Sequence, residues 1–313
     1  MTSKIAITAL SAAIVATLVA AVPAVAQEGP EVRIRRAVAR VVVIVEDRTN
    51  VAVEIEPGSA GLPSPGITVV GNETRIDGEL GRRPFRECRS GPTDARQPGE
   101  GASVEIRNRG RINLSEAPLI VIRTPPSVDI STDDSAVFGA IGRGATSIEL
   151  ASGGCGDWTV ANTSGDASFA VGGSGSIRAG TSRSLEASIS GSGRITAGAT
   201  GDLEAAISGS GTIIAATATG RVEAAITGSG DIRVNGGRPT SVDAAIGGSG
   251  DIIIRGDTGP LDASIAGSGD IEVTGTVASL DASLVGGGDV SVGRVAGGVS
   301  QSVMGGGRVR IGN

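Results

Sequence analysis

Apolar and polar residues alternate at every second position through most of the chain from Val128 to Ile311. In one copy of the pattern the apolar or side-chain-free positions are Leu203, Ala205, Ile207, Gly209, Gly211 and Ile213. The positions between them are Glu204, Ala206, Ser208, Ser210 and Thr212. A period of two is typical of extended strands with two different faces, and two glycines in every copy disfavour a helix. The pattern therefore predicts strands throughout this region.

The alternating phrase returns at a nearly constant interval. Its central Gly-Ser-Gly, or the residues that replace it, begins at Asp134, Gly154, Gly173, Gly191, Gly209, Gly228, Gly248, Gly267, Gly286 and Gly305, so successive copies are 18 to 20 residues apart. A repeat of this length is one structural unit that buries its apolar face against copies of itself. We therefore predict an all-β protein, a parallel β-solenoid (β-helix) of about ten regular coils of 18–20 residues.

Stacked coils place equivalent residues in columns about 4.8 Å apart. One predicted inward column is Phe138, Trp158, Ile177, Ile195, Ile213, Ile232, Ile252, Ile271, Val290 and Val309. A second is Ile130, Leu150, Phe169, Ala187, Ala205, Ala224, Ala244, Ala263 and Ala282. We expect Phe138 and Trp158 to fill a wider first end of the core. The glycines are expected to face inward at a bend, where a Cβ atom would collide with the opposite wall.

Residues 1–26 have the features of a secretory signal peptide. Lys4 precedes an apolar run from Ile5 to Val22, and Ala24-Val25-Ala26 offers a small-residue cleavage site. No later apolar stretch is long enough to span a bilayer as a helix. We expect an exported chain, in the periplasm or at the cell surface, with β-rich N-terminal coils and a covering segment over residues 27–115 and the repetitive solenoid over residues 116–313.

The N-terminal part contains strand patterns without the repeat. Residues 39–45 and 51–55 flank a five-residue connection and are predicted to pair as a hairpin. Residues 67–70 and 74–77 flank Gly71-Asn72 and predict a second hairpin. This part is expected to cover the first end of the solenoid, because an open sheet edge favours aggregation. No covering segment follows the last strand, so we expect self-association at the C-terminal end.

Cys88 and Cys155 are the only cysteines. Paired cysteines in an exported chain are more often bridged than free, because the compartments outside the cytoplasm are oxidising. We predict a disulfide that holds the N-terminal part to an early coil.

The charge pattern argues against nucleic acid as a partner. The net charge is −6, and residues 126–313 carry 11 Arg and 19 acidic residues. Binding to nucleic acid depends on positive charge and, for single strands, on aromatic platforms, whereas this chain has three Phe, one Trp and no Tyr.

The acidic residues themselves fall into two predicted outward columns, which form a candidate acidic contact face. The first acid column is Glu186, Glu204, Glu223, Asp243, Asp262 and Asp281, and the second acid column is Asp231, Asp251, Asp270 and Asp289. Three roles fit these columns: an electrostatic contact surface, loose binding of divalent cations, and a solvated face that discourages sheet-on-sheet aggregation.

The phrases Leu185-Glu-Ala-Ser-Ile-Ser-Gly-Ser-Gly-Arg-Ile195 and Leu261-Asp-Ala-Ser-Ile-Ala-Gly-Ser-Gly-Asp-Ile271 resemble the head GIN domain family, a domain of unknown function named for auto-transporter adhesins. The run Leu119-Ile-Val-Ile-Arg-Thr-Pro-Pro-Ser-Val-Asp-Ile130 is similar to that family's entry into its first regular coil. The resemblance covers about residues 35–311. It implies a right-handed parallel β-helix in a bacterial envelope protein, and it brings no catalytic residues with it.

Motifs with a known chemistry are scarce. Gly247-Gly248-Ser249-Gly250-Asp251 approaches the calcium-binding nonapeptide, but its Asp comes one residue early, which reverses the face of the carboxylate in a strand. The chain has no His, which removes the commonest general base and His-containing metal sites. We expect no enzyme activity, no cofactor and no metal centre, and a binding or structural role towards an envelope protein or glycan that the sequence does not identify. The alternative is a carbohydrate-active enzyme that uses stacked carboxylates.

Overall fold

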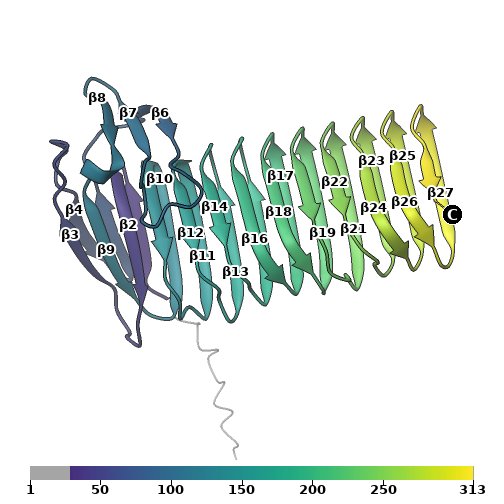
Figure 1. The fold of residues 1–313 in the computed structure, drawn as a ribbon, viewed down its shortest axis with the longest axis horizontal. Helices are drawn as coiled ribbons and strands as arrows, with labels where there is room; N and C mark the ends of the chain where they lie inside the picture. The colour runs from purple at the N-terminus through teal and green to yellow at the C-terminus, as the bar shows by residue number, and fades with distance from the viewer. Residues whose placement is uncertain (1–28, 313) are drawn as a thin grey trace, which may run out of the picture.

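A computed structural model describes residues 29–312 (Figure 1). The predicted signal peptide lies outside these residues. The described chain is a rod of stacked coils, with the N-terminal strands at one end and the last repeats at the other. The parallel β-solenoid expected from the period is confirmed, with coils of about 19 residues.

Each coil contributes one strand to each of two stacks, and neighbours within a stack are parallel. The first stack contains β5 (Glu73–Asp77), β1 (Glu31–Arg35), the first half of β10 (Ser127–Ile141), β11 (Ser147–Cys155), β13 (Asp166–Val171), β15 (Ser184–Ile189), β17 (Asp202–Gly209), β19 (Arg221–Gly228), β21 (Ser241–Gly248), β23 (Leu261–Gly267), β25 (Leu280–Gly286) and β27 (Val299–Gly305). The second stack contains β9 (Leu119–Thr124), β2 (Val38–Val45), the second half of β10, β12 (Asp157–Val160), β14 (Ser176–Ala179), β16 (Arg194–Thr200), β18 (Thr212–Ala218), β20 (Asp231–Val234), β22 (Asp251–Ile254), β24 (Ile271–Val277), β26 (Val290–Val295) and β28 (Val309–Ile311).

The first coils do not follow chain order. Strands β1 and β2 form a coil that lies between β10 on one side and the pair β5 and β9 on the other. Two antiparallel strands, β3 (Ala52–Glu56) and β4 (Gly66–Val70), then lie outside β9 and β5 at the end of the rod. The parallel stacking therefore ends in antiparallel strands at the N-terminal end.

One predicted hairpin is confirmed and the other is wrong. Strands β4 and β5 pair antiparallel around Gly71-Asn72, as expected. The predicted pairing of residues 39–45 with 51–55 does not occur, because β9 lies between β2 and β3 and pairs with both. The five-residue connection allows a hairpin, but β2 gains a longer parallel partner in β9 from more than seventy residues away.

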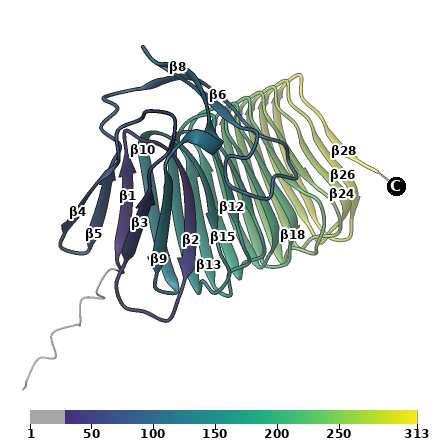
Figure 2. The same ribbon diagram turned by 60° about the vertical axis from the view of Figure 1, so that its left-hand side comes forward.

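A small antiparallel sheet projects from the N-terminal half of the rod (Figure 2). Its strands are β6 (Phe85–Arg89), β7 (Ser103–Ile106) and β8 (Gly110–Asn113), followed by the 3₁₀ turn η1 (Leu114–Glu116). A second hydrophobic cluster beneath it contains Val104, Ile106, Leu114, Ala136 and Phe138. The predicted disulfide between Cys88 on β6 and Cys155 on β11 is present, and it ties this sheet to the coils.

The inward columns form one continuous core along the rod. Ile213, Ile232 and Ile252 are in register in neighbouring coils and fully buried. The second column runs from Ile130 through Leu150 and Phe169 into alanines, as expected. Burying an aliphatic side chain of this size stabilises a fold by about 1.5–3 kcal/mol, so the repeated columns hold the coils together.

Phe138 is not part of the inward column, contrary to the prediction. A β-bulge between Thr132 and Ser135 adds one residue to β10, so Ser135, not Asp134, is the partner of Gly154. The shift turns Phe138 outward beneath the small sheet and places Gly139 opposite Trp158. A Cβ atom on Gly139 would lie 2.3 Å from the Trp158 ring, so this glycine leaves room for the indole.

The repeated glycines are required for a different reason from the expected collision with the opposite wall of the core. Gly209 has φ +144°, and a Cβ atom there would lie 2.4 Å from the carbonyl oxygen of Gly191 in the preceding coil. A Cβ atom on Gly211 would lie 2.6 Å from the Ile189 side chain. The clash is therefore with the adjacent coil, and the first glycine also supplies a backbone conformation that L-residues avoid.

The last coil is the least covered. Every residue of β27 is exposed, and Val299, Val303 and Met304 are among the exposed large apolar side chains of the described chain. Between residues 29 and 312 no helix is long and apolar enough to cross a membrane.

Candidate functional site

The first acid column lies in register on the outer surface of the first stack. Its six members are consecutive partners from Glu186 to Asp281, and all six are exposed. Asp129 and Glu149 hold the same position in two earlier coils, separated from Glu186 by Ser168. The column is thus longer than the sequence comparison of the regular repeats indicated. Like charges about 4.8 Å apart make this side of the rod a line of negative potential.

The acids of this column differ in their surroundings. Glu223 forms an ion pair with Arg221, with an N–O distance of 2.5 Å. Burial raises the pKa of the Asp262 carboxyl, and the neighbouring Asp243 and Asp281 raise that pKa further. The Asp262 carboxylate is therefore disfavoured first by burial and then by its two like-charged neighbours.

The second acid column has a structural task. The Oδ1 atom of Asp251 accepts a hydrogen bond of 3.2 Å from the backbone N–H of Asp270, and that of Asp270 accepts one of 2.9 Å from Asp289. Asp289 in turn accepts a bond of 2.8 Å from the backbone N–H of Arg308. These carboxylates satisfy N–H groups at the corner between the two strands of a coil.

The motif at residues 247–251, which approaches the calcium-binding nonapeptide, also has a structural role. The Asp251 carboxylate is engaged with the next coil, and within residues 29–312 no three acidic or cysteine side chains are grouped so that they could hold one metal ion.

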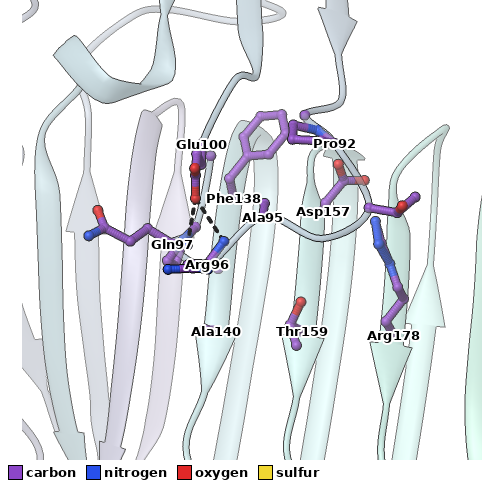
Figure 3. A pocket seen from close by; sticks show the side chains of 15 residues that line it. Pro92, Ala95, Arg96, Gln97, Glu100, Phe138, Ala140, Asp157, Thr159 and Arg178 are labelled. Carbon is purple, nitrogen blue, oxygen red and sulfur yellow. Dashed lines mark hydrogen bonds between the residues drawn. The ribbon is translucent and has the colours of Figure 1, made fainter.

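A cavity of about 130 Å³ lies between the second stack and the loop of residues 91–100 (Figure 3). Its floor consists of outward residues from three adjacent coils: Phe138 and Ala140 on β10, Asp157 and Thr159 on β12, and Arg178 on β14. Figure 3 shows the loop passing over these side chains, with Pro92 and Ala95 facing them.

The loop over the cavity is held by local contacts. The Glu100 carboxylate accepts hydrogen bonds of 2.7 and 3.2 Å from the backbone N–H groups of Arg96 and Gln97 (Figure 3). Turns close between Pro92 and Ala95 and between Gln97 and Glu100. The Cys88–Cys155 disulfide lies just before the loop in sequence and just before Asp157 on the floor, so it joins both walls of the cavity.

These features define a class of protein: an all-β solenoid built from repeats with a glycine corner. A family model described as "Putative auto-transporter adhesin, head GIN domain" matches residues 36–237 and, in a second alignment, residues 214–313. The two matches cover most of the chain, which therefore belongs to this family, as the resemblance implied. Overlapping matches are expected when one repeat can align in more than one register. A search among curated proteins gave no match.

Sequence reasoning found the acid columns but missed the cavity. Residues 81–101 are mostly polar and lie outside the repeat, and nothing in their sequence indicates which coils they cover. One usable signal was present: the predicted disulfide to Cys155 brings the loop next to Asp157 and the strand that follows.

Proposed function

We propose that this protein is exported to the periplasm or cell surface of a bacterium, where it binds an envelope protein or glycan, or supports the envelope, through the outer surfaces of its solenoid. The observation that carries the proposal is the in-register outer surface of the first stack, where exposed acids flank small residues such as Ala206, Ala225 and Ala245. Such a surface is long, flat and chemically uniform. It suits an extended partner better than a single small molecule.

Two further findings support this proposal. The chain belongs to a family whose name describes an adhesin. A disulfide between distant residues is typical of proteins that fold outside the cytoplasm.

The binding role is tested with residues 27–313 and isolated envelope fractions. We expect peptidoglycan or envelope polysaccharide to retain the chain in co-sedimentation, and retention to change when Glu186, Glu204 and Glu223 are replaced together by Gln. The matched control replaces the exposed Glu54, Glu56 and Glu116, which lie at the N-terminal end. Equal effects of the two triple variants, or no retention of the unmodified chain by any fraction, would contradict a role for the acidic face.

We propose further that the protein is not an enzyme. A glycosidase needs two carboxylates with different roles and different pKa values, whereas the acids of the first column repeat in nearly identical positions. The competing hypothesis is a carbohydrate-active enzyme. A turnover screen with soluble polysaccharides is expected to show no activity, and a hydrolysis that is abolished by Glu204→Gln or Asp251→Asn alone would establish the enzyme instead.

A further inference from the structure

We propose that the cavity beneath residues 91–100 binds a single uronic acid residue of a glycan, with the sugar carboxylate on Arg178. This inference rests on the proposed binding function and gives one site on the molecule a ligand class. It is independent of the acidic face, which lies on the other stack.

Arg178 is an arginine without a carboxylate partner. On four of the described strands an arginine forms an ion pair with the acid two residues earlier on the same face, as Arg233 does with Asp231 at 3.0 Å. At Arg178 the corresponding residue is Ser176, and Arg178 makes no ion pair with any residue in the range 29–312. Its half-buried guanidinium points into the cavity (Figure 3). A guanidinium binds a carboxylate through two parallel hydrogen bonds, so it fits a ligand that carries one.

Asp157 is held in position for a neutral donor. The Ser176 hydroxyl donates to its Oδ1 atom at 2.5 Å, which fixes the carboxylate and leaves Oδ2 to accept from a ligand hydroxyl. Thr159, next to Arg178 in the adjacent coil, adds a hydroxyl that makes no hydrogen bond with a described residue. The floor therefore presents a cation on one side and hydroxyl-binding groups on the other.

This combination distinguishes between ligand classes. A phosphate group carries about 1.5–2 negative charges at pH 7, against one on a carboxylate, so Asp157 would repel it more strongly in a partly buried site. A neutral sugar would leave Arg178 unpaired. A uronic acid has one carboxylate and several hydroxyl groups on a compact ring, and the exposed Pro92 and Ala95 offer apolar contact to its C–H groups.

The size and stiffness of the cavity agree with one sugar residue. The volume of about 130 Å³ is well below the roughly 300–1,000 Å³ of cavities that hold drug-sized ligands, so the cavity fits one small residue of a glycan and not a longer chain. The loop is held by Glu100 and by the disulfide, so little ordering is needed on binding.

The probes are D-glucuronate and D-galacturonate, titrated into residues 27–313 and followed by calorimetry and by the fluorescence of Trp158. Trp158 is the only tryptophan and packs against Gly139 in the cavity floor. For a small ligand we expect saturable binding with a Kd on the order of 1 mM. Glucose, acetate and inorganic phosphate should bind at least tenfold more weakly.

Arg178→Ala should weaken uronate binding at least tenfold. The matched control is Arg233→Ala, because Arg233 occupies the same outward column three coils further on, outside the cavity. Both variants remove a half-exposed arginine, and their unfolding temperatures should be similar. Uronate binding that survives Arg178→Ala, equal losses in the two variants, tighter binding of phosphate, or no saturable binding of either uronate would overturn the proposal.

Failure of this site can be told apart from failure of the proposed function. The acidic face does not include Arg178. If the uronate site is wrong and the proposed function is right, Arg178→Ala should leave retention on envelope fractions unchanged. A loss of both activities would point to the cavity as the main binding surface.

Discussion

Which residue can occupy a given position in this fold depends on contacts with the preceding coil as much as on the position's own strand. The corner glycines show this most clearly, since Gly209 sits against the carbonyl of Gly191 and Gly228 sits in the same way against Gly209. The serines between the glycines are exposed and are not subject to that contact. The physical requirement therefore falls on the first and third residues of the Gly-Ser-Gly corner and not on the second.

Gly209→Ala should destabilise the protein, whereas Ser210→Ala should not. The backbone at Gly209 has φ +144°, a conformation that costs an L-residue about 1–3 kcal/mol, and the added Cβ atom would also press on Gly191. Ser210 is exposed, so its replacement should change the free energy of unfolding by less than about 0.5 kcal/mol. Denaturant unfolding of the two variants compares them directly, and equal stabilities would refute the corner argument.

Asp262→Asn should stabilise the protein at neutral pH. Burial and the neighbouring Asp243 and Asp281 raise the pKa of Asp262 in the folded state, so its favourable contribution exists at low pH and is lost as the pH rises through the folded pKa. Removing a like charge between cross-strand neighbours is worth about 0.2–1 kcal/mol. The gain should shrink as the pH falls through the folded pKa and be absent below the unfolded value of about 3.9, where the carboxyl is neutral in both states.

Asp77→Asn should change the stability at neutral pH in the opposite direction to Asp262→Asn. A hydrogen bond from Arg36 is the main cause that lowers the pKa of Asp77, so its contribution is present above the unfolded pKa and lost as the pH falls through the folded one. This variant should be less stable than the unmodified chain at pH 7 and approach it in acid. Unfolding curves at pH 3 to 8 measure both variants, and the same sign for the two at pH 7 would contradict the assignment.

At the scale of elements, the period determined most of what could be predicted. A constant interval of 18–20 residues fixed which residues share a column, and the columns at Ile213 and Ala205 follow it. The period gave the wrong column for Phe138, because one extra residue in the β10 bulge turns that side chain outward. The sequence did contain a signal for this shift: Gly139, next to Phe138, has no side chain and so leaves room for the Trp158 ring. The insertion of β1 between β5 and β10, and of β2 between β9 and β10, had no local signal, because parallel pairing between distant segments is set by tertiary packing. The cavity was missed for the same reason.

The disulfide should act on one element more than on the whole molecule. Cys88 and Cys155 are 67 residues apart, and removing a native bridge typically costs about 2–5 kcal/mol. In the double variant Cys88→Ala, Cys155→Ala we expect faster hydrogen exchange first in β6–β8 and residues 91–100, with the coils from β15 onward unchanged. Binding of uronate should weaken as well, because the loop wall loses its tether. Uniform acceleration along the rod would show instead that the bridge supports the solenoid as a whole.

At the scale of the molecule, the rod is a one-dimensional stack in which each coil contacts only its neighbours. The two ends of that stack differ. Antiparallel β3 and β4, the small sheet and the disulfide cover or brace the N-terminal coils, whereas the side chains of β27 are all exposed. Local opening in such a stack begins where a coil has a neighbour on one side only.

Hydrogen exchange along residues 29–312 should therefore show a gradient towards the C-terminal end. Amides of β27 and β28 are expected to exchange fastest among the solenoid strands, those of β25 and β26 next, and those of β15–β22 slowest, because opening an inner coil breaks two interfaces and not one. Replacing the exposed Val303 by Thr should leave this order intact, while Leu284→Ala, which removes a buried side chain one coil further in, should accelerate exchange in β25 and β27 together. Equal protection of the terminal and central coils in a dilute sample would contradict end fraying. Protection of β27 that rises with protein concentration would show that a second copy covers its edge, which is the self-association expected at the C-terminal end.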